Sequence, residues 1–263
     1  MSEERREPLL LLHGLGGSKE IWSPVIGLLE AERAPLALDL PGFGAEPPLA
    51  AQVEPSAANL AAAVHQRCRA LGIERPHVAG NSLGGWVALE LAALRPVASL
   101  TLLSPAGLWK RDTPGYCRVS LQASRWLARH AAGLLSRLLR FRLGRVLVLG
   151  QTHGRPARLT PGYARAAIQA MGTCPGFEAT LAATARQGYR ATAPITAPVK
   201  LAFGSRDVLL LRGQSRHLDQ LPPGIQAETL PRCGHVPMAD DPGAVAELIT
   251  RTAVRAAQAP VMR

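Results

Sequence analysis

Aromatic residues are scarce in this chain, because Phe, Trp and Tyr together make up 4% of its 263 residues. No recognised nucleic-acid-binding motif is present either. The formal net charge of +11 therefore does not by itself indicate a nucleic-acid partner. We expect no nucleic-acid binding.

Long apolar runs are also missing. No stretch reaches about 18 uncharged apolar residues, the approximate minimum for a membrane span. The charged residues 1–7 lead directly into Pro8–Leu12, and that apolar run is cut by His13-Gly14. It lacks the small-residue cleavage site of a signal peptide, so we expect a cytoplasmic protein.

Cysteines are few and widely spaced. The four of them form no C-x-x-C pair and no metal-ligand pattern. We therefore expect reduced structural thiols and no bound metal. The four positions are Cys68, Cys117, Cys174 and Cys233.

Acidic residues are nearly absent from one segment. Residues 107–190 contain 14 Lys and Arg but only 2 Asp and Glu, whereas the rest of the chain contains 16 and 17. Within this segment, residues 117–143 have amphipathic helical spacing, with four arginines on one side. Those arginines are Arg118, Arg125, Arg129 and Arg140.

The basic segment has three interpretations. It is a solvated face over an apolar underside, an electropositive entrance for anionic substrates, or a membrane-docking surface. The uneven charge also indicates that residues 107–190 form a separate unit.

The remaining chain alternates short apolar runs with helical patterns. This rhythm predicts a mostly parallel sheet with crossover helices, an α/β fold. We expect about six strands, at residues 9–12, 35–40, 77–80, 99–104, 199–204 and 226–230. Helical patterns lie at 21–32, 56–71, 86–94, 161–171, 177–189, 214–221 and 242–255. The predicted core is residues 1–106 and 191–263, and residues 107–190 are a helical insertion.

A candidate nucleophile follows the third predicted strand. Ser82 stands in Gly80-Asn81-Ser82-Leu83-Gly84, between a strand-like run and a helical one. This pattern is typical of a nucleophile elbow, a sharp turn whose flanking glycines avoid Cβ clashes. The pattern alone is common, so its context decides its meaning.

The context supplies an acid and a base. Asp207 follows the strand at 199–204, and His235 follows the last strand. A serine hydroxyl needs an imidazole to take its proton and a carboxylate to orient that imidazole. Asp112, after the strand at 99–104, is the alternative acid. The backbone N–H groups of Leu15 and Leu83 are candidates for an oxyanion hole.

These motifs resemble those of the α/β-hydrolase family over most of the chain. The resemblance implies a catalytic triad of Ser82, Asp207 and His235, an oxyanion hole at Leu15 and Leu83, and a cap domain at the insertion. The matching pieces are His13-Gly14-Leu15-Gly16-Gly17, Asp39-Leu40-Pro41-Gly42-Phe43-Gly44, Gly80–Gly85, Gly204–Asp207 and Gly234-His235.

The sequence departs from the family pattern at its start. Family members usually begin with a β-hairpin before the first strand, but only eight residues precede Leu9 here. We therefore expect six strands rather than eight, with the site intact.

The resemblance implies a serine hydrolase that cleaves an ester or related acyl bond in a small molecule, apolar or anionic, without a metal or organic cofactor. A carbon–carbon bond hydrolase or a lyase acting on a carboxylated substrate is the alternative, and a non-catalytic ligand-binding protein is a third hypothesis. A shared fold does not decide among them.

Other polar residues have structural interpretations. We expect His13 to brace the loop after the first strand and Asp39 to hold the turn at 41–44. Cys233 is interpreted as a packing residue. The remaining histidines are expected to be surface or structural residues, namely His65, His77, His130, His153 and His217.

Overall fold

The computed structural model describes residues 6–31 and 33–258. Its centre is a six-stranded, fully parallel sheet in the order β2-β1-β3-β4-β5-β6. The strands are β1 (Pro8–Leu12), β2 (Ala34–Leu38), β3 (His77–Asn81), β4 (Ser99–Leu103), β5 (Val199–Gly204) and β6 (Ala227–Leu230). The predicted six-stranded parallel sheet is confirmed.

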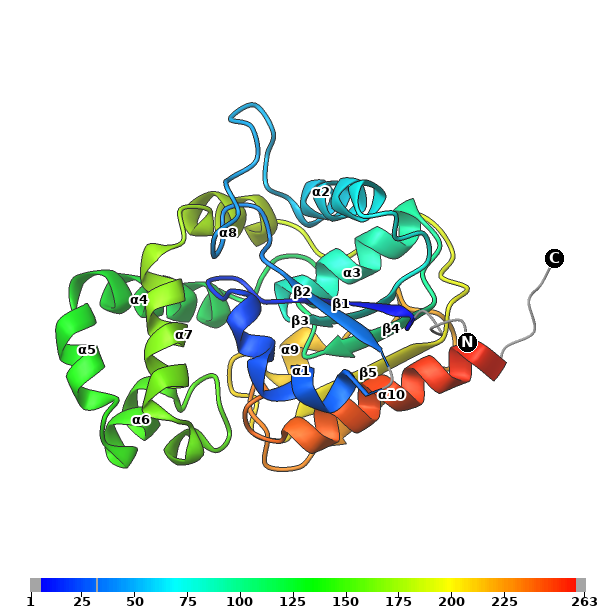
Figure 1. Ribbon diagram of the computed structural model, residues 1–263. Coiled ribbons are helices and arrows are strands. Elements are labelled where there is room, and N and C mark those ends of the chain that lie inside the picture. The colour runs from blue at the N-terminus through cyan, green and yellow to red at the C-terminus, as the bar shows by residue number, and fades with distance from the viewer. Residues whose placement is uncertain (1–5, 32, 259–263) are drawn as a thin grey trace.

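Helices cover both faces of this sheet (Figure 1). In β1, Leu10 and Leu12 pack in the core shared with α2 (Ala57–Ala70) and α3 (Leu83–Leu94). Leu9 and Leu11 pack in the opposite core, against α1 (Ser23–Leu29) and α10 (Pro242–Gln258). Because successive strand residues point to opposite faces, a strand buried on both sides must be apolar throughout, as this leucine run is.

The strand order places the loops after β1 and β3 side by side. The chain moves outward from β1 to β2 and then returns to β3 on the other side of β1. This reversal is the point of an open α/β sheet where ligands bind, at the carboxyl ends of the strands. The glycine-rich loop after β1 and Ser82 after β3 are therefore neighbours.

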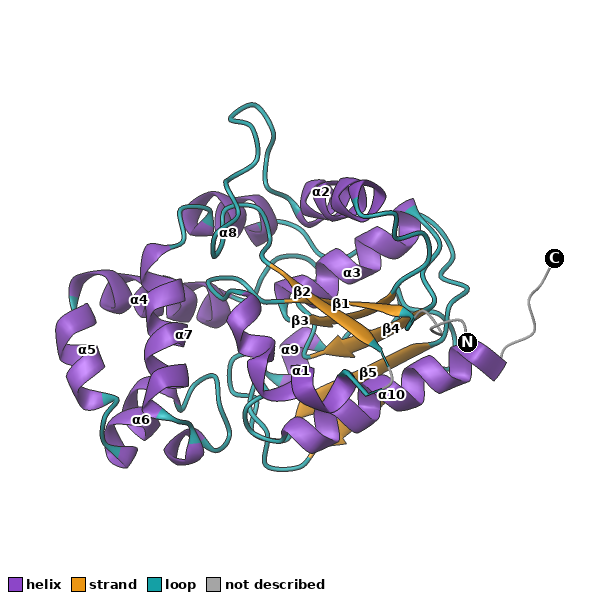
Figure 2. Cartoon of the chain, viewed as in Figure 1, coloured by secondary structure: helices purple, strands orange, loops and turns teal. Residues whose placement is uncertain are grey.

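The insertion between β4 and β5 consists of helices joined by loops, with no strand among its described residues (Figure 2). It contains α4 (Gly115–His130), α5 (Ala132–Leu138), α6 (Arg142–Leu149), η2 (Pro156–Arg158), α7 (Pro161–Thr173) and α8 (Phe177–Ala185). We call this group of helices the cap. A helical insertion between strands is confirmed, whereas its bounds at 107 and 190 stay a prediction.

Several predicted helices differ from the observed ones. The amphipathic segment 117–143 is not one helix, because the chain leaves helical geometry at Ala131 and is extended at Phe141. Arg125, predicted on the basic side of that helix, is buried. The helix expected at 214–221 is only α9 (Arg212–Ser215), and the one expected from residue 21 begins as η1 (Lys19–Trp22) followed by α1. None of the helices in the described ranges is long and apolar enough to cross a bilayer.

Candidate active site

Ser82 stands at a sharp turn between β3 and α3. Its backbone has φ 54° and ψ −118°, a conformation that residues with a Cβ rarely adopt. Glycines make this turn possible: a Cβ on Gly80 would lie 2.2 Å from the Gly84 carbonyl oxygen. A Cβ on Gly84 would lie 2.3 Å from the carbonyl oxygen of Leu12. The turn therefore holds the serine at the carboxyl edge of the sheet.

The loop after β1 approaches this serine closely. A Cβ built on Gly14 would lie 3.0 Å from Ser82 Cβ and 3.5 Å from its Oγ. Leu15 and Leu83, the two candidates for the oxyanion hole, line one cavity together with Ser82. Leu83 is the first residue of α3, so its N–H belongs to the helix turn that has no helical acceptor.

His13 braces the loop that carries Leu15. Its Nε2 accepts the backbone N–H of Leu40 at 3.0 Å, which leaves Nδ1 protonated to donate to the Gly14 carbonyl at 2.8 Å. Burial lowers the pKa of His13, so the ring is neutral at physiological pH. The structure thus gives His13 the bracing contacts that the sequence predicted.

Asp207 and His235 come together from the loops after β5 and β6. His235 Nδ1 lies 3.0 Å from Asp207 Oδ2. The other oxygen, Oδ1, accepts the N–H groups of Leu209 and Leu210 at 3.0 and 2.9 Å. Burial by itself raises the pKa of Asp207, but the charge and hydrogen bond of His235 and the Leu210 N–H outweigh it and lower that pKa. The carboxylate stays ionised.

The alternative acid Asp112 and the expected turn residue Asp39 have other surroundings. Asp112 is exposed, and the carboxylate that contacts His235 belongs to Asp207. Asp39 accepts the backbone N–H of Lys19 at 2.7 Å and that of Ala45 at 3.1 Å. Its contacts are those of a residue that holds the turn after β2, as predicted.

Sequence reasoning missed two polar residues that hold the site together. Asn81 donates through Nδ2 to the carbonyl oxygens of Leu103 and His235, at 3.0 and 2.9 Å. Asp240 accepts the N–H groups of Gly154 and Gly234 at 2.7 and 2.8 Å. The sequence signal that could have identified Asn81 is its position beside Ser82. Asp240 follows no predicted strand, so the sequence offers no signal for it.

The remaining ring nitrogen of His235 is buried and has no hydrogen-bond partner among the described residues. His235 and Ser82 line the same cavity, whose volume is about 140 Å³. The cap contributes one wall, with Cys117, Leu121, Leu149, Ile168, Met171 and Leu181. Within the described residues, no Asp, Glu, Lys or Arg lines this cavity.

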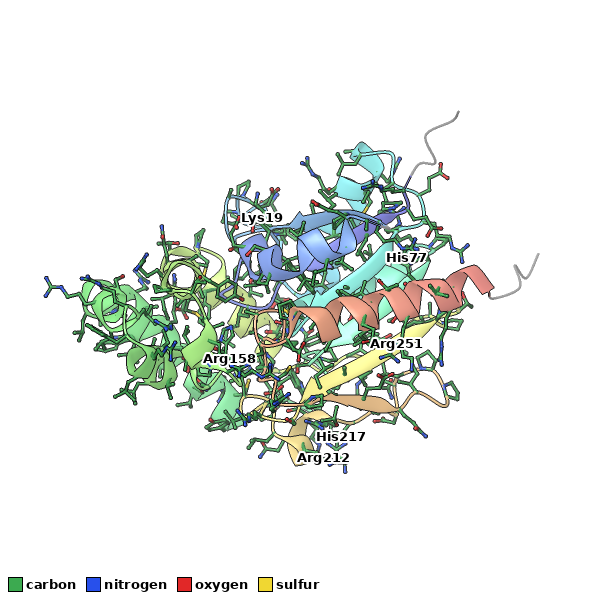
Figure 3. All side chains as sticks on the ribbon, turned by 60° about the horizontal axis from the view of Figure 1, so that its bottom comes forward. Lys19, His77, Arg158, Arg212, His217 and Arg251 are labelled. Carbon is green, nitrogen blue, oxygen red and sulfur yellow. The ribbon has the colours of Figure 1, made fainter. Side chains whose placement is uncertain are left out.

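His153 is a second histidine in the cavity wall. From the sequence it is expected to be a surface or structural residue, and the sequence does not place it at the cavity. It packs edge-on against Tyr163, with ring centroids 5.9 Å apart. Burial lowers the pKa of His153 to about 4, so its ring is neutral. His77, by contrast, binds Ser99 and Glu7 at the end of the sheet away from the cap (Figure 3).

The cysteines are all buried and free, and burial raises the pKa of Cys233 to about 11. Cys233 is therefore a protonated packing residue rather than a second nucleophile. Across residues 6–31 and 33–258, no group of three or more His, Cys, Asp or Glu is placed to hold a metal ion.

A model of the "Alpha/beta hydrolase family" matches residues 9–248. The chain belongs to this family. Among curated proteins, "Epoxide hydrolase EphH" of Mycobacterium tuberculosis is 32% identical over 207 residues, which cover 74% of this chain and 94% of that protein.

Solved structures of other proteins share the fold. A thermophilic esterase from Thermogutta terrifontis has a TM-score of 0.74 at 19% identity, covering 96% of this chain and 91% of that one. A meta-cleavage product hydrolase from Pseudomonas fluorescens has a TM-score of 0.73 at 20% identity, covering 96% and 92%. The family match makes this chain an alpha/beta hydrolase and leaves its substrate open.

Proposed function

We propose that this protein is a serine hydrolase that cleaves an ester or a related acyl bond through an acyl-enzyme at Ser82. The observation that carries the proposal is the shared cavity. Ser82 reaches it from a strained turn, and His235 reaches it with one ring nitrogen unpartnered and the other bonded to Asp207.

In the proposed reaction, His235 Nε2 takes the proton of Ser82 Oγ as that oxygen attacks the carbonyl carbon of the substrate. The negative charge that develops on the carbonyl oxygen is stabilised by the N–H groups of Leu15 and Leu83. His235 then gives the proton to the departing alcohol, and a water activated by the same ring releases the acid. Asp207 orients the ring and stabilises its charged form.

A serine nucleophile favours acyl transfer over epoxide opening. A serine oxygen that opened an epoxide would form an ether, and a histidine-activated water does not cleave ethers. An acyl-serine ester, by contrast, is hydrolysed by the machinery that made it. We therefore do not propose for this chain the epoxide hydrolysis that the name of the 32% identical relative indicates.

The cavity favours an uncharged, apolar acyl group. Its volume of about 140 Å³ is close to that of an engineered apolar cavity that binds benzene. Because no charged side chain lines its described walls, a carboxylated substrate would be buried without a counter-ion. This argues against the carbon–carbon hydrolase or lyase alternative, whose expected substrates are carboxylated.

The test is hydrolysis of a panel of uncharged p-nitrophenyl esters by the wild-type protein and by Ser82→Ala. We expect Ser82→Ala to lose roughly 10⁴- to 10⁶-fold in kcat. The matched control is Ser23→Ala at the exposed start of α1, which should keep full activity.

Labelling with a fluorophosphonate probe separates an enzyme from a ligand-binding protein, since the probe needs an activated serine. Labelling of wild type and of Ser23→Ala, but not of Ser82→Ala, is the expected result. Undiminished ester turnover by Ser82→Ala, or an unlabelled wild-type protein, would contradict the proposal.

A further inference from the structure

The most exposed large apolar side chains of the described chain are confined to one part of the cap. All six that are at least 60% exposed lie between residues 119 and 147, in α4, α5, α6 and their connections. We call residues 119–147 the cap tip. The six are Val119, Trp126, Leu134, Phe141, Leu143 and Leu147, with exposures of 62, 60, 60, 66, 69 and 73%. A concentration of this kind marks an interaction surface.

The cap tip is strongly basic. Residues 113–177 contain ten arginines and no acidic residue. Within the tip, Arg125 and Arg145 are buried and bond backbone carbonyls. The other four, Arg129, Arg137, Arg140 and Arg142, are exposed. The partner that complements this surface is therefore both apolar and anionic.

The cap tip projects away from the sheet, with α5 at its far end (Figure 1). Many side chains of these green helices extend outward from the ribbon (Figure 3). A lipid surface deforms around such a projection, whereas a folded acidic protein would have to match the positions of three separate helices. Arginines beside Trp, Phe and Leu also suit the boundary between lipid phosphates and acyl chains.

We propose that the cap tip docks onto a bilayer that contains anionic lipids, with its apolar side chains at the acyl boundary and its arginines on the lipid phosphates. The docking goes beyond the proposed chemistry and does not depend on Ser82. It would place α4 and α6, which also line the cavity, directly at the lipid surface.

Binding is measured by co-sedimentation with vesicles of phosphatidylcholine plus phosphatidylglycerol, and with vesicles of phosphatidylcholine alone. We expect binding to the anionic vesicles only, and weaker binding at higher salt. Trp126 gives an independent signal, because Trp22, Trp86 and Trp109 are buried. Its fluorescence should shift to the blue and be quenched by lipids brominated on their acyl chains, and Trp126→Phe should abolish both changes.

The apolar part and the basic part of the surface are each tested with a double variant and a matched control double variant. Leu143→Ser with Leu147→Ser should weaken vesicle binding about tenfold or more through lost apolar contact. The control is Leu28→Ser with Leu94→Ser, on α1 and α3, where the leucines are 54 and 51% exposed. Arg140→Gln with Arg142→Gln should weaken binding about 30-fold, whereas Arg67→Gln with Arg69→Gln on α2 should not.

Three results would overturn the proposal. The first is no binding of wild type to anionic vesicles. The second is vesicle binding that the Leu143 and Leu147 changes leave intact. It would mean that the anionic lipids attract the basic protein non-specifically. The third is a wild-type dimer in sedimentation without lipid that these same changes dissociate, since a second copy would then cover the surface. Fluorophosphonate labelling and far-ultraviolet circular dichroism establish that each variant is folded.

Discussion

At the scale of single residues, Asn81 connects three parts of the site. Its side-chain amide donates to the Leu103 carbonyl at the end of β4 and to the His235 carbonyl in the loop after β6. The next residue is Ser82, so one side chain fixes the turn that carries the proposed nucleophile relative to the loop that carries the proposed base. A short polar side chain in the middle of a buried parallel sheet has few other uses, because both of its donors must be satisfied there.

Asn81→Ala should therefore affect both stability and activity. The buried His235 carbonyl loses the Asn81 donor, and the Leu103 carbonyl keeps the backbone N–H of Ser82. This should lower the free energy of unfolding by about 1–3 kcal/mol. Loosening His235 should also lower kcat for ester hydrolysis more than it raises KM, because the base acts in the transition state. Urea unfolding and steady-state kinetics measure the two effects.

The control for this prediction is Asn59→Ala, since the side chain of Asn59 donates to the exposed carbonyl of Glu54, shortly before α2. It should change the free energy of unfolding by less than about 0.5 kcal/mol. Equal effects of the two substitutions on kcat would show that Asn81 does not position His235.

The contrast between Asp207 and Asp240 shows which residues a sequence reveals. Asp207 and His235 each follow a predicted strand, and a parallel sheet brings such positions to one edge, so their contact could be predicted. Asp240 holds Gly234 and Gly154, and Gly154 belongs to the cap. Its role depends on how the cap packs on the core, which no local pattern specifies.

At the scale of elements, the cap differs most from its sequence pattern. Helical spacing over residues 117–143 predicted one amphipathic helix, yet the chain turns twice. Gly144 packs so closely that a Cβ on it would lie 1.9 Å from the Leu138 carbonyl oxygen. Arg145 donates to the Leu139 and Arg140 carbonyls at 2.9 and 3.2 Å, near the end of α5. These carbonyls have no helical partner, so a buried arginine stabilises the turn.

Arg125 plays a similar part between α4 and the α7–α8 connection. Its guanidinium donates to the carbonyl of Met171 and, at 2.8 Å, to that of Cys174. It also lies over the Phe177 ring, 5.5 Å from the centroid. Helical spacing alone grouped Arg125 with the other three arginines on the basic side of the segment. Periodicity gives the direction of a side chain and not its partner.

We expect Arg125→Leu to destabilise the protein by about 3 kcal/mol, because two buried carbonyls lose a charged donor. Thermal and urea unfolding measure this loss. The same substitution at exposed Arg118 is the control and should stay within about 0.5 kcal/mol of wild type. An Arg125→Leu protein as stable as Arg118→Leu would show that the cap is held by its apolar contacts alone.

At the scale of the whole molecule, three buried histidines make stability depend on pH. His13 contacts the loop after β1, His77 lies at the opposite end of the sheet, and His153 lies where the cap meets the core. Burial lowers the pKa of all three, because a charged ring would lose its hydration. The folded state therefore binds fewer protons than the unfolded state in mildly acidic solution.

The sign of the resulting pH dependence follows from His153. Its ring takes up a proton near pH 6.5 when unfolded and near pH 4 when folded. Unfolding is thus coupled to proton uptake between these values, so the free energy of unfolding falls as the pH drops through this window. His153 alone accounts for up to about 3 kcal/mol of the fall, from its shift of about 2.5 pH units. His13 and His77 act in the same direction.

His153→Leu should therefore be less sensitive to acid than the wild-type protein, whatever its stability at neutral pH. Urea unfolding at a series of pH values from about 7 to about 4 gives the slope for each protein. The substitution should remove up to about 3 kcal/mol of the loss seen in wild type. The same change at exposed His130 should leave the slope as it is. Parallel curves for wild type and His153→Leu would show that this ring has the same pKa in the folded and the unfolded protein, and the lowered pKa assigned to the buried ring would then be wrong.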